Sequence, residues 1–202
     1  MTIDRDDLLN SILESLSRID YIKPDEIPNI ELYMDQVTTF MDSHLKASKR
    51  HQEDKVLTKT MINNYAKNNL LPPPVKKKYS KEHIFMLIYI YYFKNILSIS
   101  DIQSLLKPLS EKYFSSDSAL SMQDIYLEVF GFEANQVDVL KQDIVDKFNM
   151  SQKTFEEASK DDREFLTLFS FICMLSFDVY TKKQLIEKII DQLSDDSSGK
   201  KA

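Results

Sequence analysis

The scarcity of glycine constrains the fold of this chain more than any other feature of its sequence. Only Gly131 and Gly199 occur among 202 residues, and good helix formers such as Leu, Met, Lys and Glu are plentiful. This composition favours a mostly helical protein, and the expected fold class is all-α. Two isolated glycines also exclude a Walker phosphate-binding loop and a dinucleotide-binding fingerprint, because both need several glycines at fixed spacing.

Side chains suited to covalent or metal chemistry are few. Cys173 is the single cysteine and lies in an apolar stretch, so we expect a buried thiol. One cysteine forms neither an intrachain disulfide nor a Cys-based zinc site, which agrees with a reducing cytoplasm. His44, His51 and His83 follow no metal-ligand spacing. We therefore expect no catalytic residue, no metal and no cofactor, and the chain is not expected to be an enzyme.

The apolar runs of the sequence predict core helices. Neither the run from Ile84 to Phe93 nor the interrupted run from Phe165 to Phe177 reaches the roughly 20 residues that cross a bilayer. The N-terminal segment is amphipathic and lacks the continuous apolar core of a secretion signal. We expect a cytoplasmic protein that makes no membrane contact.

Caps and apolar spacing predict the early helices. Asp4 is expected to cap the first helix, which Pro24 to Pro28 interrupts. A second helix is expected from about Asn29 to His44. After the polar stretch from Lys46 to Lys55, Thr58 is expected to cap a short helix that ends near Lys67.

The later helices are predicted in the same way. Ser80 opens a helix that is apolar on every side, and Ser100 to Gln103 has the spacing of a capping box for a helix through Leu106. Pro108 and the serine-rich stretch after it predict a boundary, and four further helices are expected, the last opened by Thr181. No sustained heptad series is evident. The predicted division is an arm at 1–28, a central domain at 29–112, a helical lobe at 117–193 and a disordered tail at 194–202.

Positive charge is concentrated in one part of the chain. Residues 46–81 contain ten Lys or Arg and two acids, a net of +8, within a chain whose net charge is −6. The remaining residues therefore carry −14. A basic block is usually a solvated face, but it is also the electrostatic footprint of a nucleic-acid site.

A helix at residues 58–67 would separate its side chains by chemistry. At about 100° per residue, one arc holds only cations, amides and a hydroxyl, namely Lys59, Thr60, Asn63, Asn64 and Lys67. The opposite arc holds Met61, Ile62, Tyr65 and Ala66. Lys neutralises phosphates or contacts guanine, and Asn pairs with adenine, so the polar arc suits the major groove of double-stranded DNA. An ordinary amphipathic surface helix has the same pattern.

The string INNYAKNNLLPPPVKKKYSKEHIFMLIYIYYFKNILSISDIQSLL resembles the DNA-binding domain of MerR-type transcriptional regulators. Tyr65 matches the aromatic that ends the recognition helix, Leu70 to Pro72 match the turn that follows, and Tyr79 matches the last residue of the wing. The resemblance implies a winged helix-turn-helix at 29–112, a bacterial transcriptional regulator, and a dimer. Tyr65, Leu70, Pro72 and Tyr79 are then structural residues, and no effector is identified.

The strings LYMDQVTTF, LTKTMINNY and PPPVKKKY resemble, more closely, a bacterial family known only as a domain of unknown function. Three features depart from the MerR pattern. Asn69 replaces the glycine of the turn, which Asn can do because it tolerates the left-handed conformation. The wing is very short, and the connection from His44 to Leu57 far exceeds the three or four residues of a typical helix-turn-helix.

The wing is predicted to be a stiff proline strut that presents Lys76, Lys77 and Lys78 to phosphates. With Lys59 and Lys67, these lysines predict a slope of log affinity against log salt of roughly −3 to −5 per protomer. The alternative is a protein adaptor whose basic face meets an acidic partner. For the apolar stretch EFLTLFSFICMLSF, a core helix, a dimer interface and an effector pocket all remain open.

Overall fold

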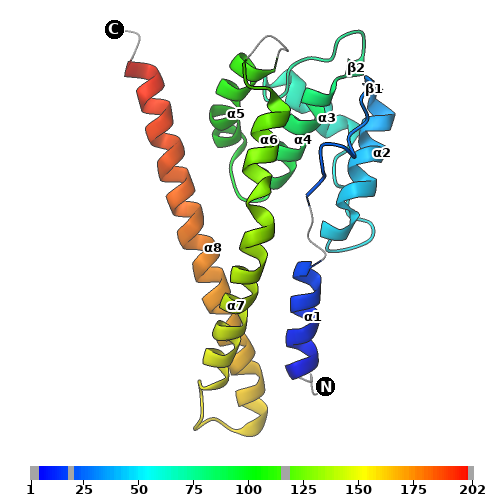
Figure 1. Cartoon of the computed structure of the whole chain (residues 1–202). Coiled ribbons are helices and arrows are strands. Elements are labelled where there is room, and N and C mark those ends of the chain that lie inside the picture. The colour runs from blue at the N-terminus through cyan, green and yellow to red at the C-terminus, as the bar shows by residue number, and fades with distance from the viewer. Residues whose placement is uncertain (1–4, 18–20, 115–118, 200–202) are drawn as a thin grey trace. The chain divides into compact units, whose positions relative to one another are not determined.

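The structure, a computed structural model, describes residues 5–17, 21–114 and 119–199. The chain is mostly helical, as its glycine-poor composition predicts (Figure 1). It divides into two compact units. The hairpin unit comprises Met1–Asp20 and Phe132–Ile186, and the core unit comprises Tyr21–Gly131 and Glu187–Ala202. The sequence divides the chain elsewhere, grouping 1–28 as one arm and 117–193 as one lobe.

The core unit begins with a short strand where the sequence predicts the first turn of a helix. β1 (Leu32–Tyr33) pairs antiparallel with β2 (Lys78–Tyr79), placing Leu32 opposite Tyr79. α2 (Met34–Leu45) therefore starts at Met34 and not near Asn29. The Gln36 side chain accepts a hydrogen bond of 2.8 Å from the Tyr33 backbone N–H, which caps this start. The strand depends on a partner far along the chain, which local periodicity does not detect.

A 3-10 turn, η1 (Lys46–Ser48), follows α2, and α3 (Lys59–Lys67) comes after a loop. α4 (Lys81–Phe93) is the centre of the unit, because every residue from His83 to Tyr91 is buried. This confirms that Ser80 opens a helix apolar on all sides. α6 (Met122–Gly131) packs against α4, and the Tyr126 hydroxyl donates a hydrogen bond of 2.7 Å to the Ile22 carbonyl.

α5 (Ile99–Tyr113) corrects two predictions. Its N-cap is Ser98, not Ser100: the Asp101 backbone N–H donates to the Ser98 hydroxyl, and the Asp101 carboxylate accepts from the Ser98 backbone N–H, each at 3.2 Å. Both choices satisfy a capping-box pattern, so sequence alone does not separate them. Pro108 lies inside this helix and does not end it. Its missing N–H removes one helical hydrogen bond, and the helix continues for five residues beyond it.

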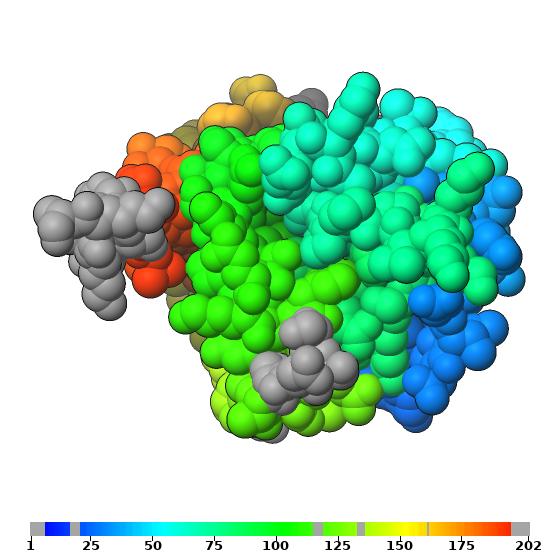
Figure 2. All heavy atoms as spheres, turned by 90° about the horizontal axis from the view of Figure 1, so that it is seen from above, coloured from blue at the N-terminus to red at the C-terminus, as the bar shows by residue number. Residues whose placement is uncertain are grey.

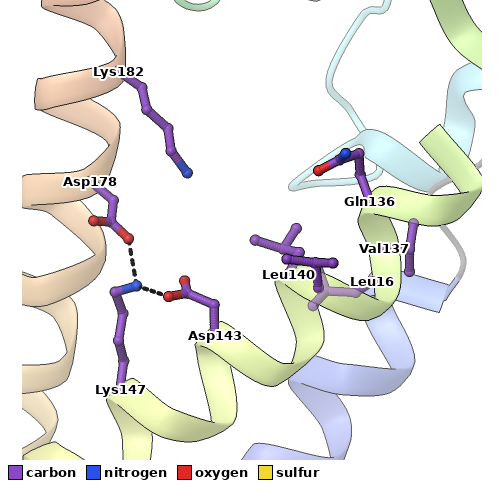
Figure 3. Close-up of a pocket in the computed structure, with 9 residues that line it drawn as sticks. Leu16, Gln136, Val137, Leu140, Asp143, Lys147, Asp178 and Lys182 are labelled. Carbon is purple, nitrogen blue, oxygen red and sulfur yellow. Dashed lines mark hydrogen bonds and ion pairs between the residues drawn. The ribbon is translucent and has the colours of Figure 1, made fainter. Parts of the chain in front are cut away.

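The hairpin unit contains α1 (Arg5–Ser17), α7 (Glu133–Gln152) and the first part of α8 (Lys160–Gly199). Asp4, the predicted cap of the first helix, lies outside the described residues. Three residues form the buried apolar core, namely Ile144, Phe148 and Phe171. Figure 3 shows that Lys147 of α7 lies between Asp143 of the same helix and Asp178 of α8, 2.8 Å from the latter. These carboxylates raise the pKa of Lys147, which in turn lowers the pKa of Asp178.

α8 is one continuous helix where the sequence predicts a break at Thr181 and a disordered tail from Ser194. It runs for 40 residues from Lys160 to Gly199. No proline lies within it, and its one glycine is its last residue, so no residue type terminates it earlier. A potential capping residue does not by itself start a new helix when the preceding residues also favour helix.

Only Thr167 and Phe171 are buried in the apolar stretch from Phe165 to Phe177, which corrects the prediction of a buried core helix. Phe171 is buried, whereas Phe165, Phe169, Ile172 and Phe177 are each at least half exposed. Cys173 is exposed as well, contrary to the expected buried thiol. The most apolar 18-residue window within Asp162–Ser194 has a mean hydropathy of 1.4, so by length and composition alone this part of α8 is apolar enough to cross a membrane.

Candidate nucleic-acid interface

α3 begins where the sequence predicts it to begin. The Thr58 side-chain oxygen accepts a hydrogen bond of 3.2 Å from the Met61 backbone N–H, as an N-cap does. Ile62 and Tyr65 are buried against the core unit. The five predicted contact residues of this helix are all exposed, namely Lys59, Thr60, Asn63, Asn64 and Lys67. The predicted division of the helix into a core face and a polar face is confirmed.

The turn after α3 is held by the last buried residue of the helix. The backbone N–H groups of Leu70 and Leu71 both donate to the Tyr65 carbonyl, at 2.9 and 3.2 Å. Asn69 has a φ of 55°, so it adopts the left-handed conformation expected of the residue that replaces glycine. Leu70 and Leu71 are buried, and the chain is thereby fixed at the point where it enters the three prolines.

The segment after the prolines is a hairpin and not a straight strut. Val75 and Lys78 exchange backbone hydrogen bonds of 3.1 and 2.9 Å. Lys76 and Lys77 between them have φ angles of 49° and 65°, and positive φ at both central residues is the signature of a type I′ turn. Lys76 and Lys77 therefore occupy an exposed tip, while Lys78 lies in β2. Figure 2 looks onto this end of the core unit, where α3, in cyan, lies beside the hairpin, in green-cyan.

Two of the predicted contact lysines pair with acids from the start of the unit. Lys59 forms an ion pair with Asp35. Lys78 lies 3.6 Å from the Glu31 carboxylate and 5.6 Å from the centre of the Tyr33 ring. These acids lie outside the basic block of the sequence, so a count along the chain did not find them. Within the described ranges, Lys67, Lys76 and Lys77 take part in no ion pair.

His83 supports the base of the hairpin, a role the sequence did not indicate. Its Nδ1 accepts a hydrogen bond of 2.9 Å from the Ser80 backbone N–H, which completes the cap of α4. The imidazole packs edge-on against Tyr79 and Phe114, with ring centres 5.3 and 4.8 Å apart. Burial lowers the pKa of His83, while the Pro73 carbonyl and Glu82 act weakly in the opposite direction. Burial also raises the pKa of Tyr79.

The lowered pKa of His83 predicts a loss of stability in mild acid. The fold favours the neutral imidazole, so its contribution to stability is present above the unfolded pKa of about 6.5 and is lost as the pH falls below that value. We expect the free energy of unfolding, measured with urea, to decline between about pH 7 and pH 5.5. His83→Gln keeps an acceptor for the Ser80 N–H and should flatten this decline. An equal decline in both proteins would assign the effect to other groups.

A groove in the hairpin unit is the second concave feature of interest. It has a volume of about 550 Å³ and is bordered by apolar side chains of α1 and α7 and by the charged cluster of Lys147 (Figure 3). Leu16, Val137 and Leu140 form its apolar side. None of its lining residues comes from the stretch 164–177, where the sequence left an apolar effector pocket open.

From β1 to α4, the core unit thus includes strand β1, helices α2 and α3, the β-hairpin that contains β2, and helix α4, in that order. The chain belongs to the DUF1836 family, described as a domain of unknown function, whose match covers residues 22–129. This confirms the prediction of such a family from three short strings, and the matched span contains the whole candidate interface. No curated protein matches the chain, and no solved structure matches it either.

Proposed function

We propose that the core unit is a MerR-like winged helix-turn-helix domain that binds double-stranded DNA, and that the protein is a cytoplasmic transcriptional regulator. One observation carries the proposal. The exposed face of α3 presents only cations, amides and a hydroxyl, and it lies in the same unit as a hairpin whose tip holds two exposed lysines without ion pairs among the described residues. A helix for the major groove and a basic hairpin for the adjacent backbone are the two elements that a winged helix uses.

The residues of α3 divide into two roles in this proposal. Asn63 and Asn64 have the amide groups that pair with the edge of adenine, while Lys67 neutralises a phosphate. Lys59 is held by Asp35, and it contributes only after that pair opens. Lys78 is likewise held by Glu31. The three remaining lysines give a salt slope of roughly −3 per chain, the low end of the expected range.

The apolar face of α8 supports the homodimer that the MerR resemblance implies. Five exposed apolar side chains form a stripe within about 60° of one direction on the helix, at 100° per residue. This α8 stripe consists of Phe165, Phe169, Ile172, Val179 and Tyr180, whose exposed fractions run from 50% to 67%. Thr167 and Phe171, which are buried, point in nearly the opposite direction. The helices of the hairpin unit therefore do not cover the stripe.

A second copy of the chain is the occupant that the charges favour. Asp162 lies at one end of the α8 stripe and Lys183 at the other. In a parallel pair each residue would meet its own copy, a repulsive arrangement, whereas an antiparallel pair centred near Ile172 places Asp162 opposite Lys183 of the second chain. Aromatic side chains bury about 150–250 Å² each, and a specific interface needs about 800 Å² per partner, so the stripe supplies a large share of it.

A protein adaptor is the second candidate function. The Lys59–Asp35 and Lys78–Glu31 pairs favour it, because they reduce the free positive charge of the face. An acidic protein partner would still meet Lys67, Lys76 and Lys77. In that case the amides of Asn63 and Asn64 would have no bases to contact.

The two functions predict different effects of removing the α3 amides. Asn63→Ala and Asn64→Ala should each relax the preference for a selected duplex over its single-base variants by about 1–3 kcal/mol. Lys67→Ala should weaken binding to all duplexes alike, because a phosphate contact carries no base information. The measurement is fluorescence anisotropy on a duplex enriched from a random pool. If the pool yields no enriched sequence and no salt-dependent binding, the adaptor is the better description.

A further inference from the structure

A second basic site lies in the core unit where the loop after α2 meets the end of α4. It is a pocket of about 400 Å³ between η1, the loop that follows it and the last turn of α4. Its lining contains four cationic side chains, namely Lys49, Arg50, Lys55 and Lys94. Asp54 is the single acid among the lining residues. This concentration of cations occurs in a chain whose net charge is −6.

Lys94 forms the inner wall of this pocket and is half-buried. Its Nζ donates a hydrogen bond of 2.7 Å to the Val56 carbonyl and lies 4.9 Å from the centre of the Tyr91 ring. A lysine ammonium has three N–H donors, and the Val56 carbonyl uses one. Burial lowers the pKa of Lys94, so its charge is poorly solvated and an anion placed beside it would stabilise the charged form.

The outer wall holds cations that are only partly neutralised. Lys49 pairs with Asp42 at 2.6 Å. The Asp54 carboxylate accepts a hydrogen bond of 2.9 Å from the His51 backbone N–H within its own turn. No ion pair of Arg50 or Lys55 occurs among the residues that the structure describes. The pocket therefore keeps a forked guanidinium and two ammonium groups for a ligand, a donor set that suits phosphate oxygens.

The position of the pocket differs from that of the DNA-binding face. The hairpin precedes the first turn of α4, whereas Tyr91 and Lys94 lie at its last turn, and a helix of this length spans about 20 Å. The pocket is instead joined to α3 through the chain. Lys55 and Val56 line it, Leu57 is buried, and Thr58 is the N-cap of α3.

We propose that this pocket binds a small phosphate-bearing molecule through Arg50, Lys55 and Lys94, and that the bound molecule restrains the segment leading into α3. The long connection between α2 and α3, which departs from the usual helix-turn-helix, is then the ligand-binding element. The proposal that the anion binds is supported by the lining residues of the pocket and does not depend on DNA binding. Its effect on DNA affinity rests on the proposed function.

Inorganic pyrophosphate is the probe for the first part. Isothermal titration of the full chain should give saturable binding at one site per chain, and Arg50→Gln with Lys55→Gln should weaken it at least tenfold. Both side chains are exposed, so the variant should fold, which circular dichroism checks. The matched control is Lys153→Gln with Lys160→Gln, which removes two exposed cations from the hairpin unit and should bind as the wild type does.

Three results would overturn the pocket. The first is the absence of saturable binding, and the second is equal weakening by the control variant. The third is loss of pyrophosphate binding on replacing Lys76 and Lys77, which would place the anion at the β-hairpin of the core unit instead. Citrate binding as tightly as pyrophosphate would refute the preference for phosphate. For the second part, DNA affinity should change at least threefold with saturating pyrophosphate in the wild type but not in the Arg50, Lys55 variant. A DNA affinity that pyrophosphate leaves unchanged refutes only the coupling between the pocket and DNA binding. A chain that binds no DNA under any condition refutes the proposed function, and the pyrophosphate titration then still tests the pocket.

Discussion

Replacing Lys76 with Asn and Lys77 with Gly should make the protein more stable and, at the same time, a weaker DNA binder. The two lysines adopt φ angles of 49° and 65°, which a side chain with a Cβ adopts only at a free-energy cost of about 1–2 kcal/mol per residue. Asn-Gly is the pair that a type I′ turn prefers. The backbone of the hairpin should therefore be kept while both charges are lost.

The expected sizes of the two effects follow from separate principles. The free energy of unfolding should rise by about 1–2 kcal/mol, since Asn tolerates and Gly prefers positive φ. Affinity for random duplex DNA should fall by about tenfold or more near 0.1 M salt, and the salt slope should change from roughly −3 to roughly −1, because two phosphate contacts disappear. Urea unfolding and anisotropy over a salt series measure these quantities on the same samples.

The opposite signs make this variant informative. If the variant loses DNA affinity and its free energy of unfolding also falls, misfolding would explain the weaker binding. That result would also contradict the predicted strain at the positive φ angles of Lys76 and Lys77. The Lys153→Gln, Lys160→Gln protein has the same net charge as the variant and should keep nearly the wild-type slope. If the hairpin variant instead binds DNA as the wild type does, the tip contacts no phosphate and the adaptor function becomes the better one.

The features that the sequence predicted correctly depend on neighbours a few residues away. Thr58 caps α3, Asn69 takes a positive φ after it, and Ser80 opens the buried helix α4. Each is a local match between a residue type and a backbone conformation. The separation of α3 into a polar and a buried face belongs to the same class, because helical periodicity alone determines it.

The features that the sequence missed depend on residues far apart in the chain. β1 exists because Leu32 meets Tyr79, and the Lys78–Glu31 pair follows from that register. The charge count along the chain predicted that Lys59 and Lys78 contact DNA, whereas in the folded structure both lysines pair with acids. Exposure of the Phe165–Phe177 run was missed for a related reason, since a buried helix and an unpartnered one have the same apolar composition.

The α8 stripe predicts a dimer that a single charge should dissociate. Ile172→Glu places a carboxylate at the centre of the stripe, where a second copy would have to desolvate it, so the dissociation constant should rise at least a hundredfold. Sedimentation velocity at micromolar concentration should show twice the chain mass for the wild type and one chain mass for the variant. Thr181→Glu adds the same charge to an exposed position well away from the stripe and should remain dimeric.

The orientation of the pair has its own test. Asp162→Lys should weaken the dimer by placing two lysines opposite each other, and adding Lys183→Asp to the same chain should restore it, because an antiparallel pair then has both charges exchanged. In a parallel pair the double change would bring no recovery. The dimer would be contradicted if the wild-type protein were monomeric in buffer. It would also be contradicted if the protein partitioned into phosphatidylcholine vesicles through α8, and that result would assign the apolar helix to a membrane surface.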